Sequence, residues 1–104
     1  MENKIVIGKL FVPKASIEEF RERNVTGKFL KELPGFVKGE SYEKLDDSGN
    51  LTMVSVANWA NSEAYDNAQR ALKEYYESIK FNPVPYRERL NIVFEMDAYS
   101  IGTY

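Results

Sequence analysis

The stretch FVKGESYEKLDDSGNLTMVSVANW, residues 36–59, contains two strand patterns separated by one turn. Residues 36–46 carry Phe36 and Tyr42 on one side and Val37 and Leu45 on the other, and residues 51–59 are rich in β-branched and aromatic side chains, which pack well on a pleated sheet. Between them lies a cluster of Asp, Ser, Gly and Asn, the residue types that favour turns. The stretch therefore predicts a β-hairpin with its turn at residues 46–50.

Two further strands are predicted outside this hairpin. Residues 5–12, IVIGKLFV, are again rich in β-branched and aromatic side chains, and the pattern stops at Pro13. Residues 89–99 alternate apolar with polar side chains, which is typical of a strand with one buried face.

A helix is predicted between the first strand and the hairpin, running from Ile17 towards Leu33. Ser16 and Glu19 fit a capping box with Ser16 as the N-cap. The apolar side chains of the segment change sides along the helix, so we expect a break near residues 24–27. A Pro-Gly pair then ends the helix.

A second helix is predicted to begin near Asn61 or Ser62, either of which can act as its N-cap. Its apolar side chains fall within about 140° of the helix circumference; they are Ala64, Tyr65, Ala68, Ala71, Leu72, Tyr75, Tyr76 and Ile79. The i,i+4 pairs Arg70–Glu74 and Lys73–Glu77 lie on the opposite side and indicate a solvated face. Residues 82–85, with two prolines, are expected to break the helix.

The element order is therefore β-α-β-β-α-β, the ferredoxin-like pattern of an α+β fold with a four-stranded antiparallel sheet. No linker or repeat divides the chain, so we expect a single domain over residues 1–104. The strands at 5–12 and 51–59 are apolar on both sides, although two helices can cover only one face. We therefore expect a homodimer in which a second sheet covers the other face. The alternative is a monomer whose loops or C-terminal tail cover it.

The composition excludes several kinds of site. The chain has no His and no Cys, which removes Ser-His-Asp and Cys-His nucleophilic sites, His- or Cys-ligated zinc, iron–sulfur clusters and disulfides. The carboxylates show no metal-ligand spacing, so no metal is expected. The net charge is −2 without a basic run, so nucleic acid is not an expected partner. No apolar run approaches the roughly 18 residues of a membrane span, and the N-terminus does not resemble a signal peptide, so we expect a cytoplasmic protein without a membrane partner.

Two short motifs resemble one family. FLKELPGF, residues 29–36, resembles the leucine and Pro-Gly-aromatic hinge between the first helix and second strand of antibiotic-biosynthesis-monooxygenase-like domains. WANSEAY, residues 59–65, is similar to the exit of their third strand, where a Trp precedes a Ser-x-x-aromatic helix start. The resemblance covers nearly the whole chain in element order. It implies a dimeric α+β barrel in which the two sheets form the barrel and each protomer keeps a pocket between its sheet and helices.

The resemblance also implies a choice of activities. Members of the superfamily include cofactor-independent oxygenases of phenolic or quinol-like compounds and haem-degrading monooxygenases. The haem-degrading enzymes carry a Trp, an axial His and an Asn, and those positions fall here on Ala68, on Ser78 and near Ile7. Only a tyrosine, Tyr75 or Tyr76, could then ligate haem.

Six side chains are candidates for the wall of a substrate pocket: Trp59, Tyr65, Leu72, Tyr75, Tyr76 and Phe29. Tyrosine rings can clamp a planar aromatic molecule while their hydroxyls orient a phenol or quinone oxygen. The alternative is that the stripe is ordinary core and that Trp59 anchors the junction of strand and helix. Arg87 and Arg89 could stabilise a phenolate, or they could be solvated. Glu95 and Asp97 share one side of the last strand and are expected to face solvent or a dimer partner.

The sequence thus favours a cofactor-independent monooxygenase acting on a small planar phenolic or quinol-like compound, although no general base stands out. A module that binds such a compound without turnover is the alternative from another class. An atypical haem-binding or haem-degrading protein is the third. No cofactor is expected for the favoured function.

Overall fold

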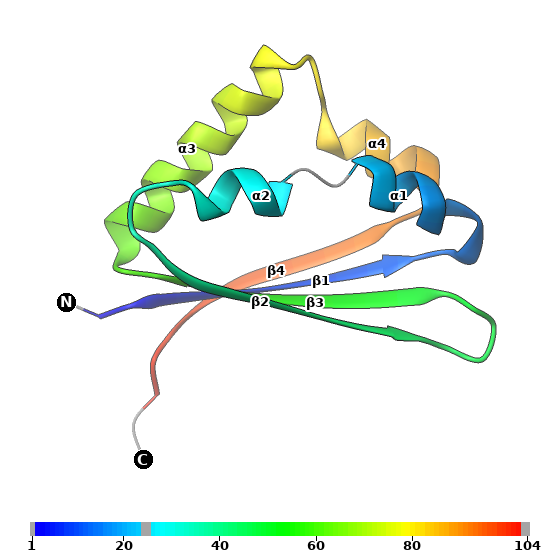
Figure 1. Cartoon of the computed structure of the whole chain (residues 1–104), viewed down its shortest axis with the longest axis horizontal. Coiled ribbons are helices and arrows are strands. Elements are labelled where there is room, and N and C mark those ends of the chain that lie inside the picture. The colour runs from blue at the N-terminus through cyan, green and yellow to red at the C-terminus, as the bar shows by residue number, and fades with distance from the viewer. Residues whose placement is uncertain (1, 24–25, 103–104) are drawn as a thin grey trace.

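The structure is a computed structural model that describes residues 2–23 and 26–102 (Figure 1). Along these residues the elements follow in the order β1 (Lys4–Val12), η1 (Lys14–Ser16, a 3₁₀ turn), α1 (Ile17–Arg23), α2 (Thr26–Lys31), β2 (Phe36–Leu45), β3 (Leu51–Trp59), α3 (Ser62–Ser78), α4 (Pro83–Leu90) and β4 (Val93–Ser100).

The strands form one antiparallel sheet in the order β2-β3-β1-β4. At its centre, Ile7 on β1 lies opposite Val56 on β3 and Asp97 on β4. Figure 1 shows the helices gathered on one face of this sheet. The predicted ferredoxin-like α+β fold is therefore confirmed.

The predicted hairpin turn is also confirmed, and Asp46 builds it. Its Oδ1 atom accepts hydrogen bonds from the backbone N–H groups of Ser48 and Asn50, each at 2.9 Å. The hydrogen bonds that Asp46 accepts, first from Asn50 and then from Ser48 and Gly49, lower its pKa because they favour the ionised carboxylate. The turn thus fixes the register of β2 against β3.

The second helix ends before residue 82, as predicted, but the prediction for residues 83–90 was wrong, because they form the separate helix α4 and not a loop followed by a strand. Asn82 caps the helix, its Oδ1 accepting from the Val84 N–H at 3.2 Å. Pro83 occupies the first turn, where the missing N–H would have no helical partner in any case. Asn91, at φ 57°, ends the helix, so the last strand begins at Val93 and not at residue 89.

The start of the first helix also differs from the prediction. Ser16 lies in the 3₁₀ turn η1, and its hydroxyl is not an N-cap but donates to the Leu90 carbonyl at 2.8 Å. This bond ties η1 to the end of α4. Helices α1 and α2 are separate, as the expected break requires, and Asn24 and Val25 between them lie outside the described residues.

The core consists of two apolar clusters on the helix side of the sheet. The first lies under α1 and α4 and contains Val12, Phe20, Leu51, Met53, Leu90 and Ile92. The second lies under the start of α3 and contains Val6, Trp59 and Ala68, with Phe36 and Tyr65 packed against it. The two clusters hold the two ends of the helical layer to the sheet.

The C-terminal end of α3 is closed by a residue with a positive φ angle. Lys80 adopts φ 55°, a left-handed conformation that is unfavourable for residues other than glycine. It closes the helix through bonds from its N–H to Glu77 O and from the Phe81 N–H to Tyr76 O. We expect Lys80→Gly to raise the free energy of unfolding by about 0.5–1 kcal/mol. Lys80→Ala, which keeps the strain, is the control in urea denaturation; a glycine variant no more stable than the alanine variant would contradict the prediction.

Candidate functional site

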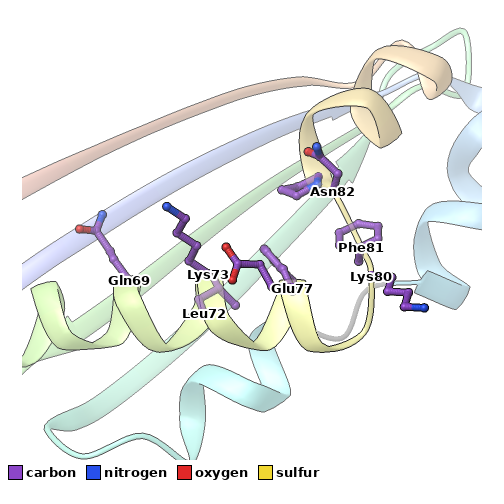
Figure 2. A pocket seen from close by; sticks show the side chains of 9 residues that line it. Gln69, Leu72, Lys73, Glu77, Lys80, Phe81 and Asn82 are labelled. Atoms are coloured by element: carbon purple, nitrogen blue, oxygen red, sulfur yellow. The ribbon is translucent and has the colours of Figure 1, made fainter.

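A cavity of about 540 Å³ lies in the angle between α3 and α4 (Figure 2). It is lined by Gln69, Leu72, Lys73, Tyr76, Glu77, Lys80, Phe81, Asn82 and Pro83. Pockets for small molecules commonly measure about 300–1,000 Å³, so this volume suits a ligand of two or three fused rings.

The local structure explains why the cavity forms here. Lys80 turns the chain sharply at the end of α3, and the Asn82 cap starts α4 after a connection of a few residues. Figure 1 shows the two helices meeting at an angle above the sheet, with α3 rising away from the strands toward its C-terminal end. The side chains near this vertex therefore surround open space.

The cavity has an apolar wall and a polar rim. Leu72, Tyr76 and Phe81 form the wall, and the Tyr76 and Phe81 rings meet edge to face with their centroids 5.2 Å apart. Figure 2 shows Gln69, Lys73 and Glu77 projecting from successive turns of α3, with Asn82 facing them across the vertex. This combination suits a planar aromatic molecule that carries polar substituents.

The helices leave part of the sheet uncovered beside this cavity. Phe94 and Met96 on β4 have the same strand parity as the buried side of β1, yet they are 38% and 46% exposed. Ser55, opposite Gly8 on that same side, is also exposed. The space between the sheet and the end of α3 is therefore open at the β4 edge.

A second hollow, of about 390 Å³, lies between the α2–β2 connection and the first half of α3. Its lining is Leu33, Pro34, Gly35, Asn61, Glu63, Ala64, Asn67, Ala68 and Ala71. It contains no aromatic ring and no basic side chain. The α3–α4 cavity is thus the better candidate for an aromatic ligand.

The structure brings two of the six candidate residues, Leu72 and Tyr76, to the α3–α4 cavity. Trp59 is only 2% exposed and lies in the second core cluster, so it occupies the anchoring position that was the alternative interpretation. Phe29 and Tyr75 stack on each other between α2 and α3, with centroids 4.3 Å apart and planes at 9°.

The tyrosine hydroxyls have protein partners. The Tyr65 hydroxyl accepts from Gln69 Nε2 at 2.7 Å, and the Tyr76 hydroxyl is hydrogen-bonded to Thr26 Oγ1. Burial, with a contribution from the Asp66 carboxylate, raises the pKa of Tyr65 and so disfavours its phenolate. The hydroxyls of Tyr65 and Tyr76 are thus satisfied without a ligand.

The two candidate arginines have other contacts. The Arg87 guanidinium lies over the Phe94 ring, 4.8 Å from its centroid. Arg89 forms an ion pair with Glu19 on α1, and neither arginine lines the cavity.

Sequence reasoning missed most of the polar rim. Lys73 and Glu77 were interpreted as part of a solvated face, and Asn82 only as part of a break. A usable signal was present, because Gln69, Leu72, Lys73 and Tyr76 follow the i, i+3, i+4, i+7 spacing of one helix stripe. That stripe adjoins the apolar arc and carries both polar and aromatic side chains.

Over residues 2–23 and 26–102, no three or more acidic side chains gather in a group that could hold a metal ion. None of the helices there is both long enough and apolar enough to cross a membrane.

Comparison with solved structures finds the same fold in several oxygenase-like proteins. SnoaB, a cofactor-independent oxygenase from Streptomyces nogalater, is 18% identical, with a TM-score of 0.62 over 100% of this chain and 97% of its own. A candidate antibiotic biosynthesis monooxygenase from Deinococcus radiodurans is 19% identical, with a TM-score of 0.69 over 97% of this chain and 94% of its own. A dimeric ferredoxin-like protein from an uncultured marine organism is 12% identical, with a TM-score of 0.71 over 100% and 99%.

The sequence comparisons add no closer relative, since no family model and no curated protein matches this chain. The structural matches nevertheless extend over essentially the whole chain, as the order of the predicted elements implied. The chain therefore has the ferredoxin-like fold of the antibiotic biosynthesis monooxygenase-like proteins.

Proposed function

We propose that this protein is a cofactor-independent monooxygenase that oxidises a small planar phenolic or quinol-like compound in the α3–α4 cavity. The observation that carries the proposal is the cavity itself, which joins the apolar wall of Leu72, Tyr76 and Phe81 to a polar rim. The shared fold with SnoaB, a cofactor-independent oxygenase, supports the same assignment.

The chemistry requires a substrate that supplies its own electrons. In an anthrone-type compound, loss of a proton gives an anion that can react directly with dioxygen. One oxygen atom then becomes the new carbonyl oxygen, and the other leaves as water with the two hydrogens of the original CH₂ group. The protein would bind the anion, orient it and exclude bulk water, roles that a half-enclosed aromatic cavity can fill.

We also propose that a second copy of the chain covers the bare face of the sheet. By strand parity this face carries Ile5, Ile7 and Phe11 of β1, Val54 and Val56 of β3, Tyr42 of β2, and Val93 and Tyr99 of β4. Tyr42 and Tyr99 are 56% and 48% exposed in the single chain. An apolar surface of this extent favours an interface, and a ferredoxin-like structural neighbour is dimeric.

The proposed function predicts oxygen uptake that depends on the cavity. With anthrone as the substrate, we expect the protein to consume dioxygen in an oxygen electrode and to form anthraquinone. Gln69→Trp fills the rim and should lower kcat/KM at least about tenfold, equivalent to about 1.4 kcal/mol. Glu74→Trp, on the outward side of α3, is the matched control and should leave the rate unchanged.

Two results would contradict the oxygenase proposal. Anthrone that stabilises the fold without oxygen uptake would instead support the binding module. Equal loss of rate in both tryptophan variants would mean that the reaction does not take place in this cavity.

A further inference from the structure

The cavity rim contains the ammonium group of Lys73, although the chain has a net charge of −2. Figure 2 shows Lys80 directed away from Lys73, and Glu77 is the one acidic lining residue. Within the described residues, the salt bridges join Arg21 to Glu43, Lys38 to Glu40 and Arg89 to Glu19. Over that part of the chain, no carboxylate therefore lies within salt-bridge distance of the Lys73 ammonium.

Each of the two side-chain amides on the rim uses one polar atom in a hydrogen bond within the protein and leaves the other atom free to contact a ligand. Gln69 donates through Nε2 to the Tyr65 hydroxyl, which leaves its Oε1 atom as an acceptor. Asn82 uses Oδ1 to cap α4, which leaves its Nδ2 group as a donor. The rim thus presents donors at Lys73 and Asn82 and a neutral acceptor at Gln69.

We propose that the ligand of this cavity is a planar aromatic compound with one acidic substituent and one hydroxyl. The anionic group is received by Lys73 and Asn82, while the rings lie against Leu72 and Tyr76. The hydroxyl donates to Gln69 Oε1. The inference deepens the proposed function, because it names the substrate class for the same cavity.

The acidic residue on the rim limits how much an acidic group adds to the affinity. Glu77 lies one helical turn after Lys73, and Figure 2 shows the two side chains next to each other. Its carboxylate repels an anion bound at Lys73, so the expected gain in affinity from the acidic group is modest.

The test compares the binding of 6-hydroxy-2-naphthoate and 2-naphthol by isothermal titration calorimetry at pH 7. The two probes differ by one carboxylate, and neither needs to react. We expect the acid to bind about fivefold more tightly, the upper end for an ion pair in contact with solvent. Lys73→Gln should abolish this preference while leaving the affinity for 2-naphthol unchanged. Lys31→Gln, an exposed lysine on α2 outside the cavity, is the matched control and should keep the preference.

The outcomes separate this inference from the proposed function. Equal affinity for the two probes in the wild-type protein, or equal loss of both in Lys73→Gln, overturns the acidic-ligand inference alone. Binding of neither probe overturns both the inference and the cavity as a site for aromatic ligands. A retained preference for the acid, without oxygen uptake on any anthrone, supports the inference and overturns the oxygenase.

Discussion

Replacing Trp59 with alanine is expected to lower the free energy of unfolding by about 3–5 kcal/mol, the usual range for removing a large buried aromatic ring. Trp59 ends β3 just before α3 begins and is almost completely buried. Its ring meets the Phe36 ring edge to face at 5.3 Å and lies 6.5 Å from the Tyr65 ring. The second core cluster is small, so little else can fill the space.

The size of this effect follows from what Trp59 connects. Val6 on β1 and Ala68 on α3 share its cluster, so the ring joins two central strands to the first half of α3. The second half of α3 rises away from the sheet (Figure 1) and packs on α2 through the Phe29–Tyr75 stack, so the Trp59 cluster is what holds the first half of the helix to the sheet. Loss of the ring should therefore also disturb the α3–α4 cavity.

Trp59→Phe separates packing from a direct role in binding. It keeps an aromatic ring and should cost roughly half as much or less. Since Trp59 is the only tryptophan, unfolding in urea should be followed by far-ultraviolet circular dichroism and not by fluorescence. A cost below about 1 kcal/mol for the alanine variant would contradict the anchoring role. A phenylalanine variant that folds normally but loses ligand affinity would mean that Trp59 contacts the ligand directly.

Two of the strands and the long helix could be predicted because their local sequences favour one structure, through β-branched side chains in the strands and one apolar arc in the helix. Residues 5–12 and 51–59 carry β-branched side chains, which favour strands over helices. Both segments form strands at nearly those bounds. The Asn61 cap was one of two predicted positions, and its Oδ1 accepts from the Ala64 N–H at 2.8 Å. These features depend on local sequence, so tertiary contacts did not alter them.

The errors occurred where a residue type fits two local structures. Pro83 suits a loop, but it equally suits the first turn of a helix, and an eight-residue helix has too few turns to show a clear apolar stripe. Ser16 had the spacing of a cap, yet the Leu90 carbonyl, distant in sequence, takes its hydroxyl. The missed helix explains only the missed Asn82, because Gln69, Lys73 and Glu77 lie on α3, where they were assigned to the solvated face or left unassigned.

The bare face of the sheet combines an apolar centre with balanced charge. Its lysines are Lys9, Lys38 and Lys44, and its acidic residues are Glu40, Glu95 and Asp97, placed there by strand register. Lys38 pairs with Glu40 at 2.7 Å, and Lys9 lies opposite Glu95. Three positive and three negative charges cancel, so two copies can approach face to face without net repulsion.

Ile7→Lys should convert the proposed homodimer into a monomer. Ile7 lies at the centre of the bare face, so a second copy would have to desolvate two ammonium groups near the middle of the interface. The single chain should tolerate the change, because the new side chain is solvated and Asp97 lies across from it on β4. Sedimentation velocity at about 10 µM should give twice the 12.0 kDa chain mass for the wild type and the chain mass for the variant.

Ser78→Lys, which adds the same charge to the exposed end of α3, should remain dimeric. A wild-type protein that sediments as a single chain, or an Ile7→Lys variant that stays dimeric with an unchanged circular dichroism spectrum, would show that this face is not the interface.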